Sequence, residues 1–539
     1  MRKLFSRTYY LNNSLLTIKN KKNHFNSSLF ILIILFLTSY KSQIKSPDLT
    51  SDLTNNKLNV LFIIADDLNC DIGVYGNKIV KTPNIDQLIK NGTLFQNAHC
   101  QYPLCGPSRA SFMTGMYTNQ TKMTKNNIFL RNTVPDVITI GQRFRQQGYQ
   151  SVRIGKIFHY DNPGTIGTSG IDDVYSWDQT INPYGRDKIE EYKINTLSPR
   201  RYGGTLSWMS SDGQDEEQTD GIGASEAIKK LENFSKTGDN FFLAVGFFRP
   251  HTPFVAPKKY FDLYNKDDIK IPKSSPEYLK TIPLPAAKSV RAKKNQINLE
   301  EDLAKEIKLA YYATISFVDA QVGRIINTLK QTGLDKNTIV VFTSDHGYHM
   351  GEHGHWQKQT LFDNATKVPL IINVPGSDYN SNISNSPVEL IDIFPTLMDL
   401  TGIITPSHVV GKSLKPIIEN ESSWVRNNAL TRWRNGYSLK TERFRLTKWE
   451  INGDFQYELY DHKYDIDELN NIALDSSYSL IRDSLIITIN QRIIEADMKP
   501  EGIGRQIENV KPTPRITNVT YGDIHNESGK RTYLKPIDK

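Results

Sequence analysis

Residues 104–115 read Leu-Cys-Gly-Pro-Ser-Arg-Ala-Ser-Phe-Met-Thr-Gly, a Cys-x-Pro-Ser-Arg segment that opens an apolar helical run. Pro107 suits the first turn of a helix, where its missing N–H costs no hydrogen bond. Ser108 and Arg109 would then lie in that turn, and Cys105 would lie just outside it. A side chain in this place faces free backbone N–H groups and the positive end of the helix dipole. The stretch therefore predicts a helix start that can hold an anion, with the Arg109 charge beside it.

Two other stretches predict buried strands that end in acidic residues. Residues 57–65 and 337–344 are continuous apolar runs without alternation, which is typical of strands covered on both faces of a parallel sheet. Open α/β sheets bind their ligands at the carboxyl ends of such strands. Hard oxygen ligands at that edge would suit Ca²⁺ or Mg²⁺. The residues expected there are Asp66, Asp67, Asp345 and His346.

The remaining pattern predicts an α/β protein with a large, mostly parallel central sheet flanked by helices. Alternating polar and apolar residues at 432–449 and 457–460 predict a smaller C-terminal antiparallel sheet. We expect loops at 160–218, a surface segment at 258–300 and a polar, loosely ordered tail from residue 498. Further helices are expected at 83–89, 139–147, 219–235, 301–332, 389–400 and 476–495, and further strands at 148–156, 240–248 and 368–374.

Length and composition indicate a soluble globular protein with more than one domain. The chain has 539 residues, of which 38% are hydrophobic and 23% charged. The expected organisation is a signal peptide at 1–42, a large domain at 48–425, a C-terminal subdomain at 426–500 and a polar tail at 501–539.

The net charge of +8 comes from the first 45 residues, which carry eight Lys and Arg and no acid. The rest of the chain is near neutral, so its charge gives no indication of a nucleic-acid partner. The apolar block at 29–37 is shorter than the about 20 residues that span a bilayer, and it fits a signal-peptide core. We expect cleavage near 39–45, export to the periplasm or the medium, and no stable membrane anchor; an anchoring helix is the alternative.

Three cysteines are present, an odd number that leaves one thiol for another use in an exported protein. Cys105 is the natural candidate. Cys70 and Cys100 either pair or stay reduced.

The Cys-x-Pro-Ser-Arg segment resembles the signature of type I sulfatases, which have an alkaline-phosphatase-like fold. The resemblance implies that a formylglycine-generating enzyme oxidises Cys105 to formylglycine (3-oxoalanine), whose hydrated aldehyde is the nucleophile, and that each chain binds one Ca²⁺. Within the family, the blocks at 59–68, 83–88, 241–254 and 343–354 are most similar to the iduronate-2-sulfatase branch. The likeness covers roughly 57–475 and is weak at 160–218 and 258–300.

The resemblance also implies roles for individual residues. Sulfate-ester cleavage needs a nucleophile, a cation, further positive charge and an acid for the leaving alkoxide. The implied metal ligands are Asp66, Asp67, Cys105, Asp345 and His346, and the implied catalytic residues are Cys105, Arg109, Lys156, His159 and His251. Lys156, His251 and Lys358 would hold the sulfate, His159 would accept a proton from the hydrate, and His251 would protonate the leaving oxygen. Taken alone, Asp66 and Asp67 would also fit a helix-capping turn. Lys156 and His159 would also fit surface charges, and His251 would also fit a structural histidine in a loop.

The expected function is hydrolysis of a sulfate ester on a carbohydrate. A 2-O-sulfated uronic acid or xylose, within a sulfated oligosaccharide or polysaccharide such as ulvan or a glycosaminoglycan, is the expected substrate. The alternatives are a phosphate-ester or phosphonate-ester hydrolase of the same superfamily and a non-catalytic glycan-binding protein.

Overall fold

The computed structural model describes residues 57–198, 202–273, 275–376, 381–420 and 422–513. The expected signal peptide and the tail beyond residue 513 lie outside these described residues. Within them, no helix has the length and apolar character needed to cross a bilayer.

The central sheet has eight strands and is mostly parallel, as the sequence predicts. The central strand, β1 (Asn59–Asp66), pairs in parallel with a neighbour on each side. One strand of the sheet, β14 (Leu370–Asn373), runs antiparallel to both of its partners. The strand order is β15 (Asn382–Ser384), β2 (Gly92–Phe95), β14 (Leu370–Asn373), β10 (Thr338–Ser344), β1 (Asn59–Asp66), β8 (Phe241–Pro250), β4 (Gln150–Gly155) and β5 (Gln179–Ile181).

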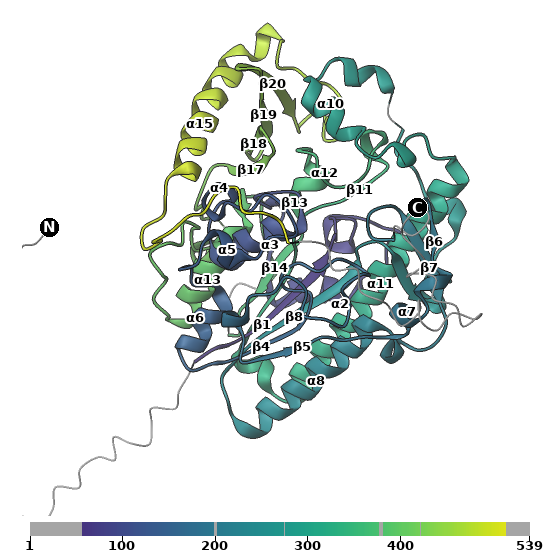
Figure 1. Cartoon of the computed structure of the whole chain (residues 1–539), viewed down its shortest axis with the longest axis vertical. Coiled ribbons are helices and arrows are strands. Elements are labelled where there is room, and N and C mark those ends of the chain that lie inside the picture. Colours follow the sequence, from purple (N-terminus) through teal and green to yellow (C-terminus); the bar gives the residue numbers. More distant parts are fainter. Residues whose placement is uncertain (1–56, 199–201, 274, 377–380, 421, 514–539) are drawn as a thin grey trace, which may run out of the picture. The chain divides into compact units, whose positions relative to one another are not determined.

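Helices cover both faces of this sheet (Figure 1). Strand β1 is buried along its whole length, and its side chains alternate between two apolar clusters. Leu61 and Ile63 pack in the first, and Phe62 and Ile64 in the second. The first cluster includes side chains of α2 (Pro83–Leu88), α8 (Thr219–Thr237) and α11 (Glu301–Gln331), and the second includes those of α3 (Cys105–Thr114), α6 (Ile140–Gln146) and α13 (Ile393–Thr401).

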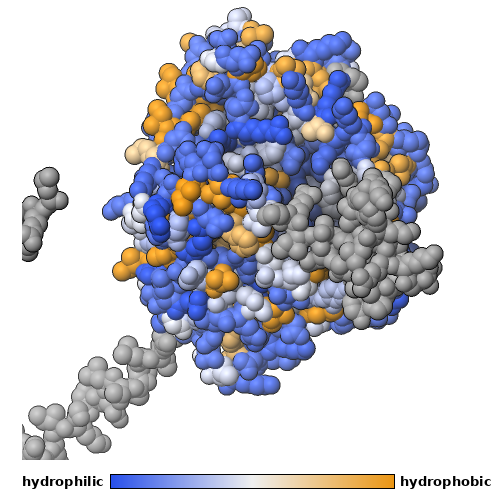
Figure 2. Space-filling model, viewed as in Figure 1, coloured by the Kyte–Doolittle hydropathy of each residue, from blue (hydrophilic) through white to orange (hydrophobic). Residues whose placement is uncertain are grey.

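A four-stranded antiparallel sheet follows in the C-terminal part of the chain, again as the sequence predicts. Helix α15 (Ser479–Asp497) packs Ile489 and Ala496 against it. The outer side of this helix leaves Leu480, Ile487 and Ile494 exposed. The face of the molecule in Figure 2 is mainly hydrophilic, with scattered hydrophobic spots. The strands are β17 (Ala429–Trp433), β18 (Gly436–Lys440), β19 (Phe444–Ile451) and β20 (Asp454–Asp461).

Two segments are more ordered than the sequence predicts. The region 160–218 contains β7 (Ser207–Ser211), which pairs in parallel with β9 (Phe254–Pro257). Residues 499–513, expected to be loose, pack on the large domain: Ile503 is buried, and the Ile507 N–H donates to the Thr133 carbonyl. Both expectations are wrong for the same reason, since each segment is held by partners distant in sequence.

The surface segment at 258–300 is mostly exposed, but one helix in it has a structural role. Helix α10 (Leu284–Val290) buries Ala286 and Val290 in a cluster with Trp433 and Trp449 of the C-terminal sheet. The helix therefore joins that sheet to the large domain.

Candidate active site

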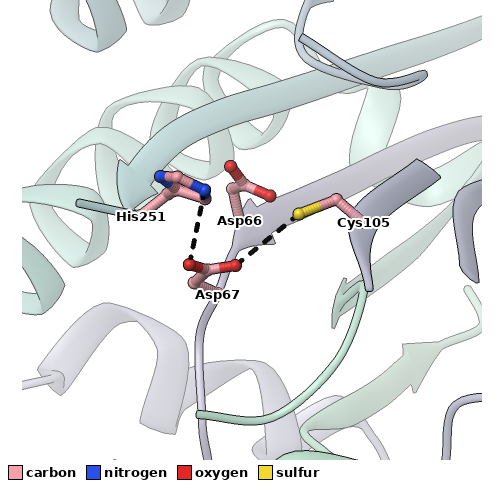
Figure 3. Close-up of side chains that lie close together, drawn as sticks. All are labelled: Asp66, Asp67, Cys105 and His251. Atoms are coloured by element: carbon pink, nitrogen blue, oxygen red, sulfur yellow. Dashed lines mark hydrogen bonds and ion pairs between the residues drawn. The ribbon is translucent and has the colours of Figure 1, made fainter. Parts of the chain in front are cut away.

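The carboxyl ends of β1 and β10 bring the predicted acidic residues together. Ala65 of β1 is in register with Ser344 of β10, so Asp66, Asp67 and Asp345 follow at the same edge of the sheet. The Asp67 backbone N–H donates to Asp345 Oδ1 at 3.2 Å. Asp67 has a left-handed backbone, with φ of 62°, which aspartate tolerates better than most residues. This turn directs its carboxylate toward Cys105 (Figure 3).

Cys105 is the first residue of α3, not a residue outside it as the sequence suggested, because Leu104 takes the extended capping position. Its Sγ lies 3.8 Å from Asp67 Oδ1 and 3.3 Å from His346 Nε2. Burial, reinforced by neighbouring carboxylates, raises the pKa of the Cys105 thiol well above its usual value. Cys70 and Cys100 are unpaired.

Arg109, one helical turn after Cys105, links the two strand ends. Its Nε donates to Asp345 Oδ2 and its Nη2 to Asp66 Oδ1, both at 2.9 Å. Its Nη1 donates to the carbonyl oxygens of Lys156 and Ile157. The side chain is fully buried, so its charge compensates the carboxylates from inside the site.

Each aspartate of the β1 end is paired with a lysine from a distant part of the chain. Lys156 Nζ lies 2.5 Å from Asp66 Oδ2, and Lys358 Nζ lies 2.5 and 2.7 Å from the two carboxylate oxygens of Asp67. Burial opposes ionisation of Asp66, but Lys156 and the other cations hold its pKa well below the usual value. Burial raises the pKa of Asp67 to about 7 even though Lys358 acts against it.

The two predicted catalytic histidines lie differently. His251 follows β8, and its Nε2 lies 3.6 Å from Asp67 Oδ2 (Figure 3). Its Nδ1 lies 2.5 Å from the Thr252 carbonyl oxygen, so that nitrogen is the one that donates. His159 lies 3.4 Å from Asp161, and within the described residues no hydrogen bond or ion pair joins it to Cys105. Burial lowers the pKa of His159 to about 4 and that of His251 well below its usual value, so both rings are neutral at neutral pH.

The site opens on the side of Lys358 and His251. The side chains of Asp66, Asp67 and Lys156 are completely buried, whereas those of Lys358 and His251 retain 9% and 8% exposure. Of these five side chains, the last two are therefore the ones that reach the surface of the site.

The residues fit a divalent cation. Asp67, Cys105, Asp345 and His346 place one ligand atom each within 4.8 Å of one another. His346 Nδ1 lies 2.9 Å from the Gly347 carbonyl oxygen, and burial lowers the pKa of this histidine to about 4. With Nδ1 donating, Nε2 presents a lone pair to Asp67 Oδ1 at 3.4 Å and Asp345 Oδ2 at 3.6 Å. A cation relieves that repulsion, and a hydrogen bond from Nδ1 is the usual support of a metal-binding histidine.

Three supporting residues were not identified from the sequence. The Ser108 hydroxyl donates to the Asp345 carbonyl oxygen, the Tyr311 hydroxyl donates to the Asp67 carbonyl oxygen, and the Tyr348 ring lies 5.8 Å from Lys358 Nζ. Ser108 lies within the quoted motif and could have been considered. Tyr311 is part of an apolar run and carries no local signal, whereas Tyr348 lies in the block at 343–354 that the family likeness already singled out.

An acidic edge of a mostly parallel sheet, facing a buried cysteine and two lysines, defines a metal-assisted hydrolase of oxyanion esters. Residues 58–403 match the sulfatase family, and residues 351–495 match the family described as N-sulphoglucosamine sulphohydrolase, C-terminal. The chain belongs to the sulfatase family.

Relatives agree with this assignment, and a solved structure shares the fold. Iduronate 2-sulfatase of Mus musculus is 35% identical over 390 residues, which cover 65% of this chain and 69% of that protein. A sulfatase of Formosa agariphila is 34% identical over 452 residues, 79% of this chain and 86% of its own. The structure of phosphonate monoester hydrolase from Silicibacter pomeroyi superposes with a TM-score of 0.69 at 22% identity, covering 84% of this chain and all of that one, which shows a shared fold.

Proposed function

We propose that this sulfatase-family hydrolase removes a sulfate ester from a carbohydrate, using a formylglycine derived from Cys105. The observation that carries the proposal is the position of Cys105 at the start of α3, between the acidic strand ends and Lys358 Nζ, which lies 3.4 Å from its Sγ. A thiol whose pKa is raised is a poor nucleophile, because the thiolate is the reactive form. Oxidation by a formylglycine-generating enzyme would replace it with an aldehyde whose hydrate attacks sulfur.

A calcium ion, one per chain, would be held by Asp66, Asp67, Asp345, His346 and the side chain at position 105. When bound, it supplies Lewis-acid polarisation of the sulfate oxygens. Calcium suits a donor set rich in carboxylate oxygens. The fully buried Arg109 would keep the carboxylates ionised and aligned.

The remaining side chains bind the oxyanion and move protons. Lys358 is the cation on the less buried side of the site, so it would hold the sulfate. Lys156 is completely buried, so it would hold the hydrate from the interior side. His159 Nδ1 has no hydrogen-bond partner within the described part of the chain and can accept a proton there. His251 would bind the sulfate and protonate the leaving oxygen; because burial lowers its pKa, an anionic substrate is needed to favour its charged form.

The role of His251 can be tested with two leaving groups. In His251→Asn, kcat on a sugar sulfate should fall by about 10²–10⁴, the usual contribution of a general acid. Aryl sulfates release a weakly basic phenolate that needs no proton, so kcat on 4-nitrophenyl sulfate should fall much less. Equal losses on both substrates would show that His251 acts by binding alone.

The proposed substrate is a 2-O-sulfated uronic acid or xylose in a polysaccharide such as ulvan or a glycosaminoglycan. Its support is the similarity to iduronate 2-sulfatase, whose name specifies a sulfated uronic acid. We also propose that the protein acts in the periplasm or outside the cell.

A phosphonate-ester hydrolase is the second candidate, because the fold is shared with such an enzyme. Among the described residues, the two ligand groups at the site share Asp67 and Cys105, as expected for one cation position and unlike a two-metal phosphatase; a third group, at Asp363, His462 and Glu468, shares no residue with them. We therefore expect sulfate release from at least one member of a panel of defined sulfated oligosaccharides, at a kcat/KM at least about 100-fold above that for phenyl phosphonate esters. The reverse order would favour the second candidate, and binding without release of either group would favour a glycan-binding protein.

A further inference from the structure

A cavity of about 350 Å³ lies between α10 and the turns of the C-terminal sheet. Figure 1 shows α10 beside β19 and β20. The lining includes Trp433 and Trp449, both of which are almost fully buried and belong to the same apolar cluster. Uncharged polar side chains also line it, those of Ser289, Gln359, Asn435 and Asn452. Aromatic surface with a few polar groups in a volume of this size is typical of a small-molecule site.

The charges that line the cavity favour an anion. Lys288 of α10 and Arg434 of the β17–β18 turn are exposed, and within the described residues neither has a carboxylate partner at ion-pairing distance. The Arg434 guanidinium lies 5.3 Å from the centre of the Trp433 ring, which fixes it at the wall. Glu450 is the one acidic side chain in the lining, so two cations face one anion.

The cavity is linked to the active site by consecutive residues of the chain. Gln359 lines it and directly follows Lys358, whose ammonium group is at Cys105. The two sites also share supporting contacts, since His355 lies between the carbonyl oxygens of Val290 in α10 and Lys358, at 2.7 and 3.1 Å. Residues 355–359 therefore connect the wall of this cavity to Lys358.

We propose that the cavity is a subsite for the saccharide unit next to the sulfated one, and that it selects a unit bearing a carboxylate or sulfate through Lys288 and Arg434. This inference rests on the proposed function and extends it to the neighbouring sugar. It predicts that the enzyme prefers anionic oligosaccharides to a single sulfated sugar.

Binding can be measured apart from turnover with unsulfated disaccharides that carry one glucuronate or iduronate residue. These probes contain no sulfate ester to hydrolyse. By isothermal titration they should bind the full chain, and Arg434→Ala and Lys288→Ala should each weaken binding about tenfold or more, the contribution of a hydrogen bond to a charged group. A disaccharide with glucose in place of the uronate should bind at least about tenfold more weakly.

Arg443→Ala is the matched control, because Arg443 is an exposed arginine of the same sheet that pairs with Asp461 and does not line the cavity. It should bind the probes as the unaltered chain does. On any oligosaccharide that the enzyme desulfates, Arg434→Ala should raise KM with little change in kcat, while turnover of 4-nitrophenyl sulfate stays unchanged.

Unaltered affinity in both cavity variants, or no affinity of the native chain for the uronate disaccharides, would overturn the subsite. Failure to release sulfate while uronate binding depends on Arg434 would overturn the proposed function and leave the subsite standing. Release of sulfate with a KM that does not respond to Arg434→Ala would overturn the subsite and leave the proposed function standing.

Discussion

Cys105→Ala should abolish sulfate-ester hydrolysis and leave the protein folded. Loss of the attacking group in a hydrolase costs on the order of 10⁶ in kcat, so turnover should fall below detection on every sulfate ester that the native chain cleaves. The side chain is small, and its weak contacts with Asp67 and His346 hold no secondary structure, so the unfolding midpoint should change little. Sulfate release and thermal unfolding measured on the same preparation check both parts.

Cys100→Ala is the control for this variant. Cys100 is another fully buried, unpaired cysteine. It packs in the second apolar cluster, and among the described residues its Sγ has one hydrogen-bond partner, the Ala365 carbonyl oxygen at 3.9 Å. Its removal should leave kcat within about twofold, since the change amounts to a small core truncation. Turnover that survives in Cys105→Ala would remove the covalent mechanism.

Asp345→Asn should lose calcium and activity together. The carboxylate is one of the atoms that converge on the cation position, and its removal should lower calcium affinity by more than the about 10- to 100-fold typical of residues that only support ligands. Arg109 keeps its bond to Asp66, so the destabilisation should stay below the about 3–5 kcal/mol typical of breaking a buried ion pair. Metal content by mass spectrometry and sulfate release are the measurements.

Asp319→Asn separates metal loss from a general effect of neutralising a buried aspartate. Asp319 accepts hydrogen bonds from the backbone N–H groups of Asn84 and Ile85 at the start of α2, away from the site. This control should bind calcium and cleave sulfate normally. Equal calcium content in Asp345→Asn and the native chain would show that the ligand set is wrong.

The central sheet could be predicted because strands buried on both faces are uninterrupted apolar runs in the sequence. The ends of β1 and β10 followed from the same runs, and parallel pairing placed Asp67 beside Asp345. The sequence did not indicate which distant segments pair when neither of them is a continuous apolar run. Strand β7 depends on β9. Residues 499–513 are held in part by Thr133, the last residue of the short helix α5 (Leu130–Thr133), more than 300 positions earlier.

The candidate site shows the same division. The motif around Cys105 and the strand ends are local signals, and the structure brings them into contact. Other contacts depend on tertiary packing and have no local signal. Arg109 donates hydrogen bonds to two carboxylates. Tyr311, from the middle of a long helix, donates to the Asp67 carbonyl oxygen. His159 matched its motif, yet among the described residues it pairs with Asp161 and forms no hydrogen bond with Cys105.

The most direct test is the chemical state of residue 105 in preparations of different activity. Conversion of cysteine to formylglycine replaces H₂S by O, a change that a mass spectrum of the peptide containing residues 104–115 resolves. Across preparations made with increasing amounts of a formylglycine-generating enzyme, sulfate release per chain should rise in proportion to the aldehyde fraction and extrapolate to zero for the thiol. Full activity in a preparation whose Cys105 is entirely thiol would contradict the account.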